Sequence, residues 1–408
     1  MKILKVFVFY FLLIVYSVEI LLFLFLEEKT FTLDQIKKNR VEIAKKEGLN
    51  YDLRTSEQAF LEFKKYNNDL EPIFLYSPIF RFSNTFKSAK KNNNIIPFRG
   101  PINSKSITCA EDLNYKLVEN DKYGFKNLNS VYENKINSML LGDSFAEGLC
   151  ENSKNDIAGH LTRYGFNTVN FGVAGTSSLV ALGIMREFKN LIKPKNFIYL
   201  YYEANDLEGL NWEKKDPHLL GYLNKEYKVN YLKKYDEIKN FLELSSIESL
   251  DYLKNVNKTE EKNKKSRFEI IKNHLIDILE LSKTKNIIRY NLFNKKYVEH
   301  DLDLFFSIIK KMNEEAKNFN SNFIFVYVPV SARYISVPKF SFKKEKQAMN
   351  LKVEILKKLN DMNINTIDLT SFFDKADNVK QYYPLGYIGH FNSNGYQKIA
   401  EIISEKLE

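Results

Sequence analysis

The residue best placed for nucleophilic chemistry is Ser144, which follows a short apolar stretch at 139–141 and precedes a predicted helix. Such a serine lies just past the carboxyl end of a strand, at the edge of an open α/β sheet where ligands bind. The helix N-terminus also offers free N–H groups to a developing negative charge. A serine or aspartate before a helix is more often a simple cap, so Gly142-Asp143-Ser144 indicates a site only together with other groups.

Three later positions could supply the base and the oxyanion donors that acyl transfer requires. Gly175 lies at the end of a second predicted strand, Asn205 lies at the end of a third, and His390 stands just before the last predicted helix. A serine hydroxyl is a poor nucleophile until a base takes its proton, and His390 is better placed for this than any other histidine. Each residue also has a purely structural interpretation. Gly175 could simply form a turn, Asn205 could cap a loop, and His390 could be a surface residue at a helix end.

Serine, glycine, asparagine and histidine in this order, three of them just after strands, resemble the SGNH (GDSL) hydrolase family. The resemblance covers roughly 136–211 and 322–408. It implies that Ser144 is the nucleophile and His390 the base. The oxyanion hole would then consist of the Ser144 backbone N–H, the Gly175 N–H and the Asn205 side chain.

One position departs from the family pattern. The family usually has an acid three residues before the histidine, where it holds the imidazole, and this chain has Tyr387 there. Another carboxylate could orient His390, the enzyme could use a Ser–His dyad, or the protein could be inactive. The candidates for the orienting acid lie upstream of the histidine: Asp368, Asp374 and Asp377.

The elements that must position these residues alternate between strands and helices. Apolar strands are expected at 139–141, 168–176, 196–206, 322–329 and 365–369. Alternation of this kind predicts a three-layer α/β/α fold with a parallel sheet. The resemblance implies the flavodoxin-like strand order of the SGNH hydrolase fold, with the cleft at the carboxyl edge of the sheet.

The predicted SGNH-like domain covers 136–408 and contains a helical insertion at about 212–320. The insertion includes a charged stretch at 258–267, expected to be a solvated linker. Insertions at this edge of the sheet would line or cap the substrate cleft.

An apolar run at 6–26 is the clearest physical signal near the N-terminus. About 21 residues of helix cross a hydrocarbon core of roughly 30 Å, and no small-residue cleavage site follows the run. The interpretation is an uncleaved signal anchor in which the acid Glu19 snorkels or pairs; a buried helix of the soluble domain is the alternative. Residues 1–5 are expected to form a cytoplasmic tail. The region at 27–135, predicted to be helical and extended, would either hold the catalytic domain away from the bilayer or pack over its cleft.

Cys109 and Cys150 are the two cysteines of the chain. Outside the cytoplasm an even pair is expected to form a disulfide, although two separate buried thiols are the alternative. Closing a loop of about 40 residues would stabilise the fold by about 3–4 kcal/mol. No further cysteine or histidine lies near in the sequence, so no metal site is expected.

The net charge of +10 comes from scattered lysines. The sequence has no clusters of arginine and aromatic residues, so this positive charge predicts a solvated surface and no nucleic-acid partner. An anionic membrane or an acidic glycan is a better match for the charge.

The hypothesis is therefore a single-pass inner-membrane protein with an extracytoplasmic catalytic domain. It would be a serine esterase that removes O-acyl groups, specifically acetyl, from an envelope glycan and needs no cofactor. The substrate class depends on the family resemblance and the location. An O-acyltransferase that uses the same serine, or an inactive glycan-binding or scaffold protein, are the alternatives.

Overall fold

The computed structural model describes residues 2–25, 33–72, 97–262, 272, 275–282, 284–285, 300–336 and 343–407. Parts of the predicted membrane-proximal region (27–32 and 73–96) and of the predicted linker (263–267) lie outside them. The chain divides into two compact units. One comprises Met1–Thr32, Asn255–Glu299 and Pro338–Ser341, and the other contains the rest of the chain. Each unit is described by itself below.

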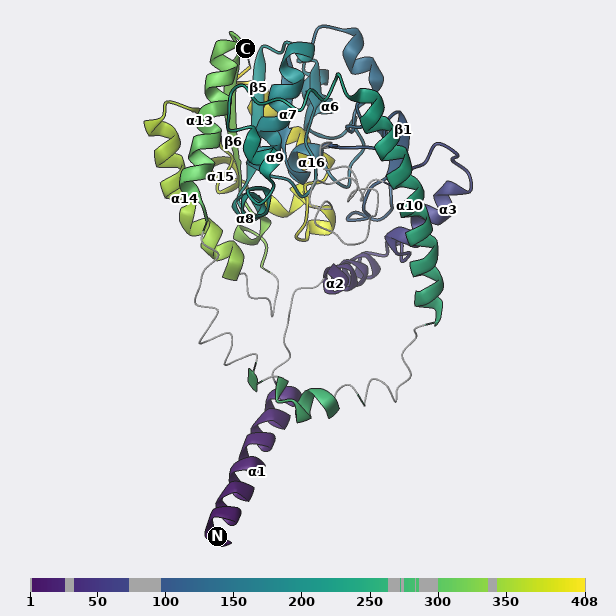
Figure 1. The fold of residues 1–408 in the computed structure, drawn as a ribbon, viewed down its shortest axis with the longest axis vertical. Coiled ribbons are helices and arrows are strands. Elements are labelled where there is room, and N and C mark those ends of the chain that lie inside the picture. The colour runs from purple at the N-terminus through teal and green to yellow at the C-terminus, as the bar shows by residue number, and fades with distance from the viewer. Residues whose placement is uncertain are drawn as a thin grey trace. The chain divides into compact units, whose positions relative to one another are not determined.

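The second unit is built on a five-stranded sheet in which every neighbouring pair of strands is parallel. Its strands are β3 (Ser138–Gly142), β4 (Thr168–Asn170), β5 (Asn196–Tyr202), β6 (Asn322–Val328) and β7 (Asn365–Asp368). They lie in the order β4-β3-β5-β6-β7. Figure 1 shows the neighbouring strands β5 and β6. The prediction of a parallel α/β sheet with flavodoxin-like strand order is confirmed.

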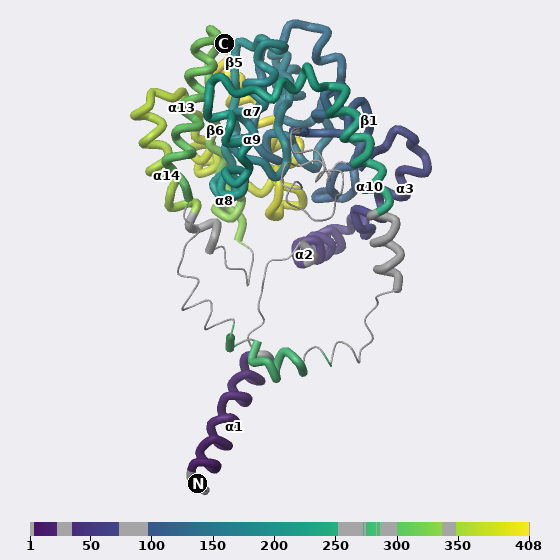
Figure 2. The backbone as a smooth tube through the Cα atoms, viewed as in Figure 1, coloured from purple at the N-terminus to yellow at the C-terminus, as the bar shows by residue number. Residues whose placement is uncertain are grey.

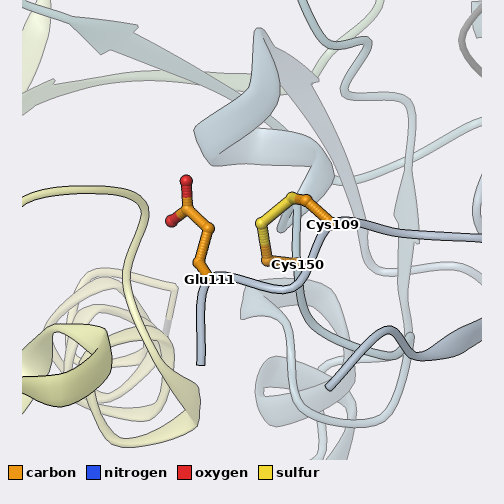
Figure 3. A group of neighbouring side chains, drawn as sticks. All are labelled: Cys109, Glu111 and Cys150. Atoms are coloured by element: carbon orange, nitrogen blue, oxygen red, sulfur yellow. A yellow bond between two sulfur atoms is a disulfide. The ribbon is translucent and has the colours of Figure 1, made fainter. Parts of the chain in front are cut away.

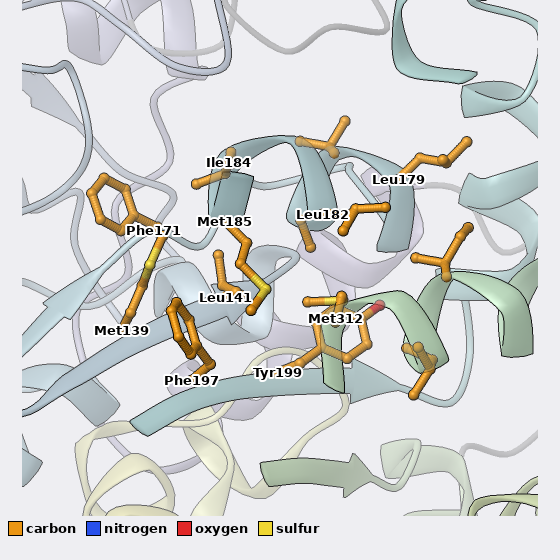
Figure 4. Packing of buried hydrophobic residues seen from close by; sticks show 14 of the residues in the cluster. Met139, Leu141, Phe171, Leu179, Leu182, Ile184, Met185, Phe197, Tyr199 and Met312 are labelled. Atoms are coloured by element: carbon orange, nitrogen blue, oxygen red, sulfur yellow. The ribbon is translucent and has the colours of Figure 1, made fainter. Parts of the chain in front are cut away.

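These stretches form strands because they are rich in aromatic and branched residues and are covered on both faces. All seven residues of β5 are buried, and Tyr199 pairs with Phe325 in the register of β5 and β6. On one face the sheet packs against the helices α7 (Ser178–Ile192) and α13 (Leu302–Asn318). Figure 4 shows Leu182 and Met185 of α7 over the side chains of the strands.

Helix α13 lies at the end of the stretch given as an insertion and packs against α7 and β6 as part of the core. The helices α6 (Ile157–Arg163) and α16 (Ser393–Ser404) pack against each other, and α14 (Lys343–Asp361) packs against β7. Short helices follow the strands along the chain: α5 (Ser144–Glu147) after β3, α8 (Asp206–Glu213) and α9 (Pro217–Gly221) after β5, and α15 (Thr370–Phe373) after β7.

The chain before the sheet folds onto the same unit. It contains α2 (Leu33–Lys46), α3 (Ser56–Lys64) and an antiparallel pair, β1 (Ser104–Ile107) with β2 (Leu117–Asn120). A capping box between Thr55 and Gln58 starts α3, because each side chain satisfies a free N–H of the other residue. Phe60 of α3 packs with Ile107 and with Leu250 of the long helix α10 (Tyr235–Lys262). Figure 2 shows α10 passing beside β1 and α3.

The first unit contains α1 (Lys2–Phe25). Its window Leu4–Leu22, with a mean hydropathy of 2.1, is long and apolar enough to cross a membrane, properties that a signal sequence shares. The buried Glu19 accepts hydrogen bonds from the backbone N–H and the hydroxyl of Thr284, at 2.9 and 2.5 Å. The acid in the apolar run therefore has polar partners within its own unit.

Candidate active site

Ser144 lies where strand β3 turns into α5. Gly142 ends the strand at φ 143°, and a Cβ there would meet the Leu200 carbonyl oxygen at 2.6 Å, so the turn requires glycine. Asp143 is the N-cap of α5, and its carboxylate accepts the N–H of Phe145 at 2.9 Å. Local sequence thus places the Ser144 hydroxyl at the carboxyl edge of the sheet.

His390 meets this serine from the other end of the chain. Its Nε2 lies 2.9 Å from Ser144 Oγ, although the two residues are 246 positions apart. The imidazole also packs on the ring of Phe145, with 4.8 Å between the ring centroids. The structure therefore brings together the nucleophile and the base that the sequence predicted.

The carboxylate beside His390 is Glu111, which the sequence did not single out. Its Oε1 lies 3.2 Å from His390 Nδ1, and its Oε2 accepts the His390 backbone N–H at 2.7 Å. One carboxylate thus contacts both the ring and the backbone of the histidine. Such a group can set the orientation of an imidazole and stabilise its protonated form.

The structure does not bring the three aspartates proposed as orienting acids to His390: other contacts hold two of them, and the third is exposed. Asp368 binds Lys352 Nζ at 2.9 Å, and Asp374 accepts a hydrogen bond from the Tyr334 hydroxyl at 3.0 Å. Asp377 is exposed to solvent.

Glu111 and the loop before His390 are held by helix α2. Arg40 Nη2 lies 3.2 Å from Glu111 Oε1 and donates to the Ile388 carbonyl at 2.9 Å. The hydroxyl of Tyr387, at the position of the family's acid, accepts a hydrogen bond from Asn39 at 2.7 Å. These described residues of the predicted membrane-proximal region therefore pack against the site.

The charges around Glu111 shift two pKa values in the directions that base catalysis requires. Burial alone would raise the pKa of Glu111, but His390 and Arg40 lower it to about 2. Burial alone would lower the pKa of His390, yet the Glu111 carboxylate outweighs it, and the pKa is raised above its usual value. Glu111 therefore stays ionised and favours the imidazolium that forms when His390 takes a proton.

A disulfide between Cys109 and Cys150 joins the two segments that carry Glu111 and Ser144. Cys109 lies two residues before Glu111, and Cys150 lies six residues after Ser144. Figure 3 shows Glu111 extending from the same segment as Cys109. Bonded to each other, the two sulfur atoms are not free to join Glu111 in holding a metal ion. The disulfide expected from the sequence brings this segment near Ser144, but it does not distinguish Glu111 from the neighbouring acid Asp112.

Removing the disulfide is expected to weaken both the fold and the site. The variant Cys109→Ser/Cys150→Ser should lose about 3–4 kcal/mol of unfolding free energy. If Glu111, His390 and Ser144 act together as proposed below, the kcat for hydrolysis of p-nitrophenyl acetate should fall as well, because the segment that carries Glu111 is no longer tied to that of Ser144. Urea unfolding and kcat, both measured at a temperature where the variant is folded, would test this. An unchanged kcat would show that the disulfide serves stability alone.

The predicted oxyanion residues follow the two strands that flank β3. Gly175 comes after β4 at φ 74°, and Asn205 comes after β5 as the N-cap of α8; both are exposed. Within the part of the chain that the structure describes, the N–H groups of Ser144 and Gly175 have no acceptor. Burial raises the pKa of the Asp143 carboxylate to about 6, although the neighbouring Asn205 side chain lowers it. Free donors at this edge could bind an anionic oxygen.

No family model matches the sequence, and no curated protein matches it. Solved structures with a similar fold include a GDSL-like lipase from Bacteroides thetaiotaomicron, at 12% identity and TM-score 0.35, with 69% of this chain and 90% of that chain covered. A lipase/acylhydrolase from Enterococcus faecalis has 11% identity and a TM-score of 0.34, with 67% of this chain and 95% of that chain covered. A mutant of an acetyl-xylooligosaccharide esterase from Geobacillus has 12% identity and a TM-score of 0.34, with 67% of this chain and 96% of that chain covered.

Proposed function

We propose that this protein is a serine esterase with Ser144 as nucleophile, His390 as general base and Glu111 as the acid that orients the histidine. The observation that carries the proposal is the line of contacts from Ser144 Oγ to His390 Nε2, and from His390 Nδ1 to Glu111. Nucleophile, base and orienting group within this reach are the arrangement that activates a serine hydroxyl.

The reaction would proceed in two acyl-transfer steps. Ser144 Oγ attacks the ester carbonyl while His390 Nε2 takes its proton, and the carbonyl oxygen becomes an oxyanion. The Ser144 and Gly175 N–H groups and the Asn205 side chain would stabilise that charge. The tetrahedral intermediate then collapses to an acyl-enzyme on Ser144 and expels the alcohol, which receives the proton from His390. Water, deprotonated by His390, then releases the carboxylic acid and restores the serine.

The proposed substrate is an O-acyl group, specifically acetyl, on an envelope glycan. This part of the proposal is supported by location. The apolar window of α1 suits a single-pass signal anchor with the body of the chain outside the cytoplasm. A disulfide is typical of oxidising compartments. In that compartment an esterase anchored to the inner membrane would reach glycans of the envelope.

An O-acyltransferase is the second candidate, because it would use the same Ser144 and His390 and differ only in the acceptor. The products formed with and without a glycan separate the two activities. An esterase releases the free acid from an acetylated glycan, whereas a transferase passes the acyl group to a hydroxyl of a free glycan. The inactive binding protein was suggested by Tyr387 at the usual acid position. Glu111 beside His390 favours an active site, because the imidazole has its carboxylate from another part of the chain.

The test uses the full chain in detergent micelles, with p-nitrophenyl acetate as substrate and a fluorophosphonate probe. Turnover of the ester and labelling of Ser144, identified by peptide mass mapping, are expected because the hydroxyl is activated by His390. Labelling without turnover in water would favour the transferase. A protein that neither turns over the ester nor reacts with the probe would contradict the enzyme and support the binding protein.

A further inference from the structure

A buried ion pair lies one helical turn beyond the proposed nucleophile and plays no part in the mechanism above. Arg99 Nη2 is 2.6 Å from Glu147 Oε1, and the two side chains are only 5% and 1% exposed. Desolvating two charges is costly, so a buried pair is weak evidence of a gain in stability. Its position beside Ser144 calls for another explanation.

The second oxygen of Glu147 holds the turn that carries Gly175. Glu147 Oε2 accepts the N–H of Ala174, the residue directly before Gly175, at 2.6 Å. Glu147 belongs to α5, the same four-residue helix that begins with Ser144. One carboxylate therefore connects the helix of the first oxyanion donor to the turn of the second.

The other backbone amides of this turn are also occupied. The N–H of Val173 donates to the Gly142 carbonyl at 3.0 Å, and that of Thr176 donates to the Val173 carbonyl at 3.3 Å. The N–H of Gly172 donates to Asn170 Oδ1 at 2.9 Å. Among the described residues, only the Gly175 N–H in the stretch 172–176 has no acceptor. The turn is held so that this one donor stays available.

We propose that Arg99 and Glu147 are positioning residues that set the distance between the Ser144 and Gly175 donors of the oxyanion hole. This inference rests on the proposed esterase mechanism. Oxyanion donors act within a narrow range of about 2.7–3.1 Å, and a displacement of about 1 Å can cost roughly 100-fold in rate. Arg99 supplies the counter-charge that a buried carboxylate needs, so its loss should also disturb the turn.

The variants Glu147→Gln and Arg99→Met test this in the full chain, with p-nitrophenyl acetate as substrate. We expect kcat to fall by about 10- to 100-fold with KM within about twofold, because the donors act on the transition state more than on the bound ester. Affinity for a methylboronic acid, which forms a tetrahedral adduct with the serine, should fall in parallel with kcat. Arg99→Lys keeps the charge and should recover part of the rate.

The matched control is Glu315→Gln. It removes the carboxylate of another buried pair, in which Arg186 Nη2 lies 2.9 Å from Glu315 Oε1 with side chains 4% and 7% exposed. That pair connects α7 and α13 and takes no part in the proposed site, so kcat should stay unchanged even if the melting temperature falls. If Glu147→Gln and Arg99→Met lose no more kcat than Glu315→Gln does, the inference is wrong while the esterase stands. A wild-type protein without turnover would instead remove the proposed function.

Discussion

Replacing Ser144 with alanine is expected to bring ester hydrolysis down to the background of the buffer. The hydroxyl 2.9 Å from His390 Nε2 is the atom that would carry the acyl group, and no covalent intermediate can form without it. In a well-studied serine protease, loss of the serine or the histidine costs about 10⁶ in kcat, as much as loss of the whole triad. His390→Ala should therefore match Ser144→Ala, and the double variant should be no slower than either.

The measurement is the initial rate with p-nitrophenyl acetate for the wild type, both single variants and the double variant. His218→Ala is a suitable control, because this half-buried histidine of α9 contacts Tyr227 and no residue of the proposed site. It should keep the wild-type rate. Substantial turnover by folded Ser144→Ala would mean that another residue is the nucleophile.

Replacing Glu111 with glutamine is expected to lower kcat by about 10²–10⁴-fold, because losing the orienting acid of a triad can cost about 10⁴ when the imidazole adopts the wrong tautomer. The amide is nearly the same size as the carboxylate, but it carries no charge to stabilise the imidazolium. Asp368→Asn and Asp374→Asn are the matched controls. Their carboxylates contact Lys352 and Tyr334, so both variants should stay near the wild-type rate.

The pH profile separates an electrostatic role of Glu111 from a purely structural one. His390 must be neutral to accept a proton, so activity should rise with pH through the pKa of His390, which the Glu111 carboxylate raises above its usual value. Removing that negative charge lowers the pKa of His390. The acid limb of Glu111→Gln should therefore move to lower pH while the plateau falls. A limb that stays in place, with a rate like that of Asp374→Asn, would contradict the assignment of Glu111.

Local sequence by itself determined the strands and the position of the serine. The fully buried strand β5 reads as a continuous apolar run, and such runs between helical segments indicate a parallel sheet. Asp143 starts the helix of Ser144 through a hydrogen bond to the N–H of Phe145, two residues further on. Local patterns of this kind are visible in a sequence because the causes lie close together along the chain.

Only the tertiary structure decided which charged residues surround the site. Glu111 meets His390 across 279 positions, and Arg99 meets Glu147 across 48. No periodicity or spacing encodes such contacts, because they depend on how the segments before the sheet fold over its carboxyl edge. The family pattern has its acid three residues before the histidine. In this chain the carboxylate beside His390 is Glu111, which lies in a segment tied by the disulfide and is paired with Arg40 of α2. The effect of the Glu111 carboxylate on His390 depends on the distance between the two groups in space, and the fold sets that distance.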